Sequence, residues 1–211
     1  MVQELIPGGG EAQFSYAALC GDGRPLASVT ARRTRQYPID FGHSSSFVET
    51  VDVPAVEDAA RQLLAAIGYT GIAEVEFKYD YRDKRYKLLE MNPRVWTWHS
   101  LCCRAGVDFP YLLWRMTHGR GISEVRGRSG LKWVRMSTDL AAAIGEIRRG
   151  RLTLVDYLTS LRGPIDSAVM ATDDPLPGVL NCFASLWSRV TGPIGFTPSM
   201  PTRTAEIPKT S

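Results

Sequence analysis

The 211-residue sequence contains few of the residues and patterns that characterise metal-binding, secreted or membrane proteins. Its four cysteines show no CxxC or CxxH spacing and its three histidines are scattered, so we expect reduced thiols and no zinc site. No segment contains the roughly 20 apolar residues of a membrane helix, and the first residues lack the charged and then apolar pattern of a signal peptide. The net charge of +3 is too small to indicate nucleic acid or an anionic membrane as a partner. We therefore expect a cytoplasmic protein.

The residues that are present indicate a globular protein with one good core. A content of 44% hydrophobic and 22% charged residues is ordinary for such a chain. Apolar and alternating runs predict strands at 13–20, 25–33, 47–51, 71–78 and 86–92. Apolar stripes and end signals predict helices at 54–67, 97–105, 109–118, 138–149 and 152–161. The predicted fold is therefore α+β: an antiparallel sheet with helices packed on one side, plus a helical C-terminal extension.

Changes in composition divide the chain into three parts. We expect a first domain at 1–119, a helical extension at 120–192 after a basic, Gly-rich link, and a disordered tail at 193–211, where Pro, Thr and Ser are frequent. Within the first domain, Gly21-Asp22-Gly23 predicts a hairpin turn, and the run from Val2 to Ile6 has the composition of a strand. The polar stretch 36–46 is expected to form a loop.

The segment GIAEVEFK and, after a turn, the segment YKLLEMNPR carry the most informative pattern. Because side chains alternate along a strand, Glu74, Glu76 and Lys78 share one face, and Glu90 and Asn92 share a face of the next strand. If Glu76 pairs with Glu90, then Glu74 faces Asn92. The alternate positions are apolar, and we expect Phe77 and Val75 to meet Leu89 and Met91 in the core. A slip of one pair still leaves Glu76, Glu90 and Asn92 on one face.

This acidic hairpin predicts a cation site. Carboxylates so close together destabilise a hairpin unless a cation or a basic group offsets their charge, and such oxygen ligands suit Mg²⁺. The alternative interpretation is a solvated sheet face, which an E-x-E-x-K strand favours when it is taken alone. The ending Glu-x-Asn-Pro-Arg favours the binding site, because Pro93 ends the strand and holds Arg94 beside the acids. A guanidinium in that position is suited to bind a phosphate or an acyl phosphate.

At these residues the sequence resembles the ATP-grasp superfamily, in which an acid on one strand and Glu-x-Asn-Pro-Arg-like residues on the next bind two Mg²⁺ and the phosphates of ATP. The resemblance implies that Glu76 is the first metal ligand, Glu90 the bridging carboxylate and Asn92 a ligand of the second metal. Arg94 corresponds to the position that contacts the transferred phosphate or the substrate. The segments WTWHS and AGVDFPYLLWR resemble a subgroup described as carbamoyl-phosphate-synthase-like or carboxylate–amine ligases.

The resemblance continues at the start of the chain. Gln3-Glu4-Leu5-Ile6 is similar to the linker that holds adenine, with backbone groups of Glu4 and Ile6 at the base edge and the base against Leu5 or Ile6. Glu11 is the nearest match to the acid that holds the ribose hydroxyls. Arg32 and Arg33 correspond to a basic position facing the triphosphate, and the sequence leaves open which of the two faces inward.

The resemblance covers about residues 2–119 and implies ATP and Mg²⁺ as cofactors of a ligase. Such an enzyme phosphorylates a carboxylate, and an amine, or less often a thiol, attacks the acyl phosphate. A complete enzyme of this kind also has a substrate-binding domain, phosphate-binding lysines and a Gly-rich lid before the adenine linker. We therefore expect an ATP-grasp part that is inactive alone, with the N-terminal half in trans or self-association as partners. The alternative is a non-catalytic module that binds nucleotide or serves as an interaction subunit.

Overall fold

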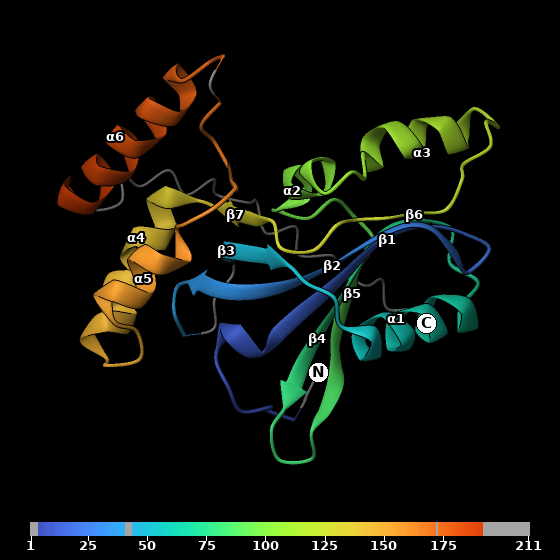
Figure 1. The fold of residues 1–211 in the computed structure, drawn as a ribbon, viewed down its shortest axis with the longest axis horizontal. Helices are drawn as coiled ribbons and strands as arrows, with labels where there is room; N and C mark the ends of the chain where they lie inside the picture. Colours follow the sequence, from blue (N-terminus) through green and yellow to red (C-terminus); the bar gives the residue numbers. More distant parts are fainter. Residues whose placement is uncertain (1–3, 41–43, 172, 192–211) are drawn as a thin grey trace, which may run out of the picture.

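The computed structural model describes residues 4–40, 44–171 and 173–191. The strands are β1 (Gln13–Gly21), β2 (Arg24–Tyr37), β3 (Ser44–Thr50), β4 (Gly71–Asp80), β5 (Arg85–Asn92), β6 (Val125–Arg126), β7 (Lys132–Val134) and β8 (Ile165–Ser167). The helices are the short 3-10 helix η1 (Gly10–Ala12) and α1 (Pro54–Ala66), α2 (His99–Arg104), α3 (Phe109–Thr117), α4 (Met136–Arg148), α5 (Leu154–Ser160) and α6 (Leu176–Thr191). The strands form one sheet in the order β5-β4-β1-β2-β3-β7-β8, with β6 paired to β2 (Figure 1).

β1 and β2 form a hairpin in the middle of the sheet, and its turn is where the sequence predicts it. Asp22 and Gly23 have φ angles of 48° and 77°, and such positive φ angles at both central residues suit the right-handed twist of the strands. The Gly23 N–H donates to the carbonyl of Tyr69 at 2.9 Å. A Cβ atom on Gly23 would lie only 2.8 Å from Cα of Ala65 in α1, so this turn needs glycine both for its backbone angle and for its approach to the helix.

Helices cover both faces of the sheet. On one face, Val56, Ala60 and Leu64 of α1 pack against a buried cluster that includes Tyr16 and Val75. On the other face, α2 and α3 pack against a second cluster, whose buried members include Leu19, Val29, Trp98, Leu101 and Trp133. Figure 1 shows α2 and α3 above the sheet and α1 below it. The predicted α+β class is confirmed, but the expectation that the helices lie on one side is wrong, because the sheet is apolar on both faces.

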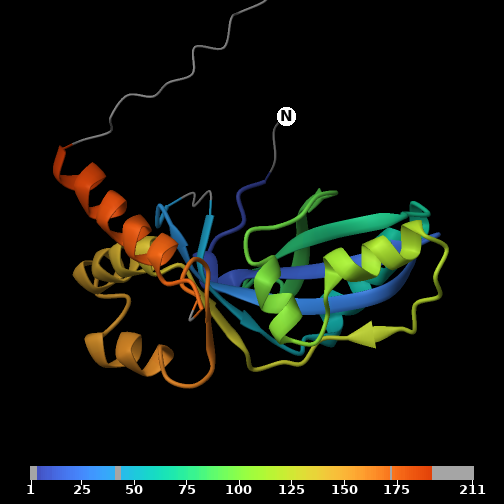
Figure 2. The ribbon, with the colours of Figure 1, turned by 90° about the horizontal axis from the view of Figure 1, so that it is seen from above.

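The segment after residue 119 adds strands to the sheet as well as helices. β7 pairs antiparallel with β3, β8 pairs parallel with β7, and β6 pairs parallel with β2, so the sheet is mixed rather than purely antiparallel. Figure 2 shows α4, α5 and α6 together at one end of the molecule. Arg35 of β2 holds α4 to the sheet through two 2.8 Å hydrogen bonds to Asp139, and both side chains are almost fully buried. The domain boundary at 119/120 stays a prediction.

Several local expectations differ from the structure. Residues 4–6 form no strand, and β2 and β3 extend into the predicted loop as far as Tyr37 and from Ser44, where their own pairing continues. α6 was not predicted. The predicted tail at 193–211 lies outside the described residues. Cys20, Cys102 and Cys103 are free thiols, as expected. Among the described residues, no helix combines the length and apolar character needed to cross a membrane.

Candidate functional site

The carboxylates of the β4–β5 hairpin meet as the side-chain alternation predicts. Glu76 pairs with Glu90 across the strands, and Glu74 pairs with Asn92. The Asn92 side-chain amide donates to Oε1 of Glu76 at 3.2 Å and to Oε1 of Glu90 at 3.0 Å. Two carboxylates and an amide from neighbouring strands therefore converge on one small area of the sheet. Val75 and Met91, which alternate with these residues, pair on the opposite, α1 side, so a shift by one residue would expose them and bury the acids.

Two arginines flank this acidic group. Arg33 of β2 donates from Nη2 to Oε2 of Glu76 at 3.2 Å, and both side chains are largely buried. Arg94 is exposed just after β5, and its Nη2 donates to Oδ1 of Asn92 at 3.2 Å. Arg32 points to the opposite face of the sheet, where its guanidinium lies 3.6 Å from Glu49. Of the two candidates that the sequence left open, Arg33 is therefore the one beside the carboxylates.

Glu76, Glu90, Arg33 and Arg94 line a polar cavity of about 250 Å³, which we call the acidic pocket. Its lining residues are Arg33, Ser44, Ser45, Glu74, Glu76, Glu90, Arg94, Thr97 and Trp98. Glu74 lies buried in its wall and accepts a 2.9 Å hydrogen bond from the indole Nε1 of Trp98. Burial and the neighbouring Glu76 raise the pKa of Glu74 to about 7. Burial also raises the pKa of Glu76, partly offset by Arg33. Charging both carboxylates is therefore costly unless a cation binds beside them.

A second, larger cavity of about 980 Å³ lies beside the acidic pocket, and we call it the large pocket. Four of its lining residues are those of the predicted adenine linker and ribose acid, namely Glu4, Leu5, Ile6 and Glu11. It is also lined by Pro7, Gly8, Gly9, Gly10, Gln13, Thr34, Arg35, Gln36, Ile39, Asp40, Lys78, Leu89, Ala142, Glu146, Arg151 and Leu152. The structure therefore brings the start of the chain, the ends of β2 and β4, and α4 around one space.

The two pockets follow one face of β4. Glu76 lines the acidic pocket, and Lys78, two residues further along the same face, lines the large pocket. Since a strand rises about 3.3 Å per residue, the two positions are about 7 Å apart. A bulge in the hairpin contributes to the second pocket, because Phe77 pairs with Leu88 and leaves Leu89 to line the large pocket. The expectation that Leu89 meets Phe77 in the core is therefore wrong.

The class of protein, an ATP-grasp protein, follows from the comparison with known families. Residues 1–138 match the family described as "ATP-grasp in the biosynthetic pathway with Ter operon". The chain belongs to this family.

Individual relatives match shorter parts of the chain. A segment of 44 residues is 50% identical to biotin carboxylase 1 of Bacillus subtilis (strain 168), and it makes up 21% of this chain and 10% of that protein. A segment of 49 residues is 45% identical to acetyl-CoA carboxylase 2 of Oryza sativa subsp. japonica, and it makes up 23% of this chain and 2% of that protein. The matched segments thus span a small part of the length of both relatives.

Solved structures resemble part of the fold. A biotin carboxylase–β,γ-ATP complex from Campylobacter jejuni has a TM-score of 0.45 at 18% identity, over 57% of this chain and 27% of that chain. The phosphoribosylaminoimidazole carboxylase ATPase subunit from Aquifex aeolicus has a TM-score of 0.44 at 17% identity, over 55% of this chain and 35% of that chain.

Proposed function

We propose that this chain binds ATP with Mg²⁺ across the two pockets and is the ATP-binding part of a ligase. The ligase would activate a small carboxylate as an acyl phosphate for attack by an amine. The observation that carries the proposal is that the two pockets are lined by neighbouring positions of β4: a cavity large enough for a nucleoside lies beside two facing carboxylates. Membership of an ATP-grasp family supports ATP as the nucleotide.

The side chains of the acidic pocket fit Mg²⁺. Within the described part of the chain, no group of three or more His, Cys, Asp or Glu side chains is arranged to hold a metal ion. Mg²⁺ does not need such a cage, because it is typically held by one or two carboxylates together with the phosphates of a nucleotide. Glu76 and Glu90 supply this pair, and the amide hydrogens of Asn92 now lie between them. A rotated Asn92 amide would present its oxygen to the same area as a third ligand.

The large pocket would hold the nucleoside. In our proposal the base lies against Leu5 or Ile6, with its edge at the backbone of Glu4 and Ile6. The ribose hydroxyls would donate to Glu11, whose carboxylate is held in place by the backbone N–H of Gly9 at 3.1 Å. Ile6 is buried, whereas Leu5 is 76% exposed, so Leu5 has surface free to cover a base.

The reaction needs positioning and charge stabilisation more than covalent chemistry from the protein. A carboxylate oxygen of the substrate attacks the γ-phosphorus and ADP leaves; the amine then attacks the acyl carbon and phosphate leaves. Arg33, held by Glu76, and Arg94, which the rotation of the Asn92 amide would release, would orient the transferred phosphoryl group and the substrate carboxylate. When bound, Mg²⁺ would neutralise the phosphate charge that builds up during transfer.

The test of the proposal is Mg²⁺-dependent ATP binding, measured by titration calorimetry on the whole chain with and without EDTA. We expect Glu90→Gln to weaken ATP binding in Mg²⁺ by about tenfold or more, since it removes a charged ligand. The control is Glu124→Gln, which removes a carboxylate that lines neither pocket and should leave the affinity for ATP unchanged. Equal affinity of Glu90→Gln and the unaltered chain, with both folded, would refute the metal assignment.

A further inference from the structure

Among the residues that the structure describes, one cation that lines the large pocket has no partner. Three basic side chains line this pocket among the described residues: Arg35, Lys78 and Arg151. Arg35 is bound to Asp139 at 2.8 Å, and Arg151 is bound to Glu146 at 2.8 Å. Within the described part of the chain, the ammonium of Lys78 makes no hydrogen bond and has no carboxylate within 4.0 Å. A half-buried ammonium without a partner carries a desolvation cost that an anionic ligand would recover.

The same pocket also has one carboxylate that no cation of the described residues contacts. Three of its acids have arginine partners: Glu4 with Arg82, Asp40 with Arg149 and Glu146 with Arg151. Glu11 instead accepts from the backbone N–H of Gly9, and no cation of the described residues lies within 4.0 Å of it. Lys78 and Glu11 attract each other electrostatically but do not touch. A ligand that fits between them would donate hydrogen bonds to Glu11 and offer a negative oxygen to Lys78.

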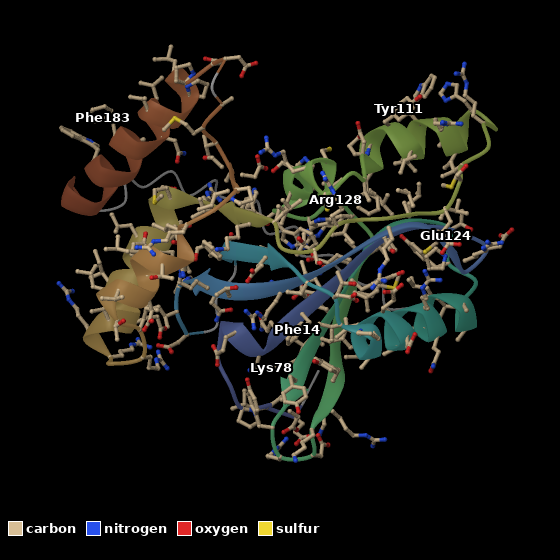
Figure 3. The ribbon with its side chains drawn as sticks, in the orientation of Figure 1. Phe14, Lys78, Tyr111, Glu124, Arg128 and Phe183 are labelled. Atoms are coloured by element: carbon tan, nitrogen blue, oxygen red, sulfur yellow. The ribbon has the colours of Figure 1, made fainter. Side chains whose placement is uncertain are left out.

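The position of Lys78 limits which anion this is. Lys78 lies at the end of β4 beside the start of β1, where its backbone pairs with Gln13 (Figure 3). The end of its side chain lies close to Gly8, since a Cβ atom on Gly8 would lie 3.8 Å from Cε of Lys78. Along β4 it is about 7 Å from Glu76, and it lines the same cavity as the linker for the base, so a ligand that spans the linker and the proposed metal ligands would pass within its reach. In a nucleotide, the group between the ribose and the terminal phosphates is the α-phosphate.

We infer that Lys78 binds the α-phosphate of the nucleotide while Glu11 binds the ribose hydroxyls, so that the unpaired charges recognise a nucleoside 5′-phosphate. This inference rests on the proposed function, because it needs a nucleotide in the large pocket. Lysine suits the task as a compact charge on a flexible stem that needs no bidentate geometry. Lys78 would then supply a cation at the α-phosphate, in addition to Arg33 and Arg94 at the terminal phosphates.

The experiment separates Lys78 from the metal site by working in EDTA with ligands that have at most one phosphate. Dissociation constants for AMP and adenosine are measured by ligand-observed NMR titration of the whole chain. The variants are Lys78→Met, Lys78→Arg and the matched control Lys84→Met, which removes an exposed lysine of the β4–β5 turn. Circular dichroism and the thermal unfolding midpoint establish that each variant is folded.

We expect Lys78→Met to weaken AMP binding by about tenfold, since a charge-assisted hydrogen bond is lost, and to leave adenosine binding unchanged. Lys78→Arg keeps the charge and should keep most of the AMP affinity; Lys84→Met should match the unaltered chain. Unchanged AMP binding in Lys78→Met, or an equal loss for adenosine, overturns the inference and leaves the proposed function standing. An unaltered chain that binds neither AMP nor Mg²⁺–ATP overturns both.

Discussion

The face of the sheet that packs against α1 and the face that packs against α2 and α3 are built from alternate residues of the same strands. On β4, Val75 and Phe77 belong to the α1 face, whereas Glu74, Glu76 and Lys78 belong to the other. The α1 face is a closed apolar core. The other face is core only where α2 and α3 cover it, and towards the ends of β4 and β2 it becomes the two pockets. Alternate residues of one strand thus pack the core and line the two pockets.

The largest effect is expected on the α1 face. Leu64 belongs to α1 and is fully buried in the core between this helix and the sheet. Leu64→Ala should therefore lower the free energy of unfolding by about 3 kcal/mol, because apolar burial is lost and a cavity remains. Urea unfolding measures this loss. Because Leu64 lines neither pocket, the folded fraction should bind ATP with unchanged affinity. A loss of affinity in the folded protein would show that the two faces are not independent.

On the other face, replacement of Glu74 is expected to raise the free energy of unfolding at high pH, by less than Leu64→Ala lowers it. The pKa of Glu74 is about 7 in the folded chain, above its ordinary value of 4.5, so the folded state holds this proton more tightly than the unfolded state. The contribution to stability is therefore present below about pH 4.5 and is lost as the pH rises through about 7. The loss amounts to about 2 kcal/mol, after allowance for solvent in the pocket.

Glu74→Gln removes this titration while its side-chain oxygen still accepts the Trp98 indole N–H. The variant should therefore be more stable than the unaltered chain at pH 8, and its stability should depend less on pH between 5 and 8. Urea unfolding without Mg²⁺ at both pH values is the measurement. An unchanged pH slope would contradict the assignment.

The smallest effect compares two neighbours on β2. Arg33→Met should weaken Mg²⁺–ATP binding by about tenfold, or about 1.4 kcal/mol, because the acidic pocket loses a guanidinium. Arg32 is the preceding residue and lies on the other face, so Arg32→Met should leave ATP binding unchanged. Loss of its exposed pair with Glu49 should lower the stability of the fold by at most about 0.5 kcal/mol. Calorimetry on both variants sharpens the comparison, and equal losses would remove the distinction between the faces.

The sequence predicts the acidic hairpin because every register that keeps its apolar residues inside puts Glu76, Glu90 and Asn92 on one face. It does not separate Arg32 from Arg33, since two adjacent arginines fit either face, and the pairing of Arg33 with Gln13 decides. Leu88 and Leu89 raise the same ambiguity: the bulge moves one leucine outward, and two identical residues carry no sign of it. Alternation already placed Lys78 on the Glu76 face, but its lack of a partner depends on side chains distant in the sequence.

The strands β7 and β8 could not be predicted for a different reason. Each has three residues, too few for a periodic signal, and each forms through pairing with a segment far away in the chain. The expectation of a purely helical extension was therefore incomplete.

The buried pair of Arg35 and Asp139 bears on what counts as a module in this chain. The matching family model ends at residue 138, one residue before Asp139. Yet Ala142, Glu146 and Arg151, beyond that end, line the large pocket. The stretch recognisable by descent and the stretch that shapes the cavity thus have different ends. A chimera joined at residue 138 would therefore exchange one wall of the cavity along with its new C-terminal part.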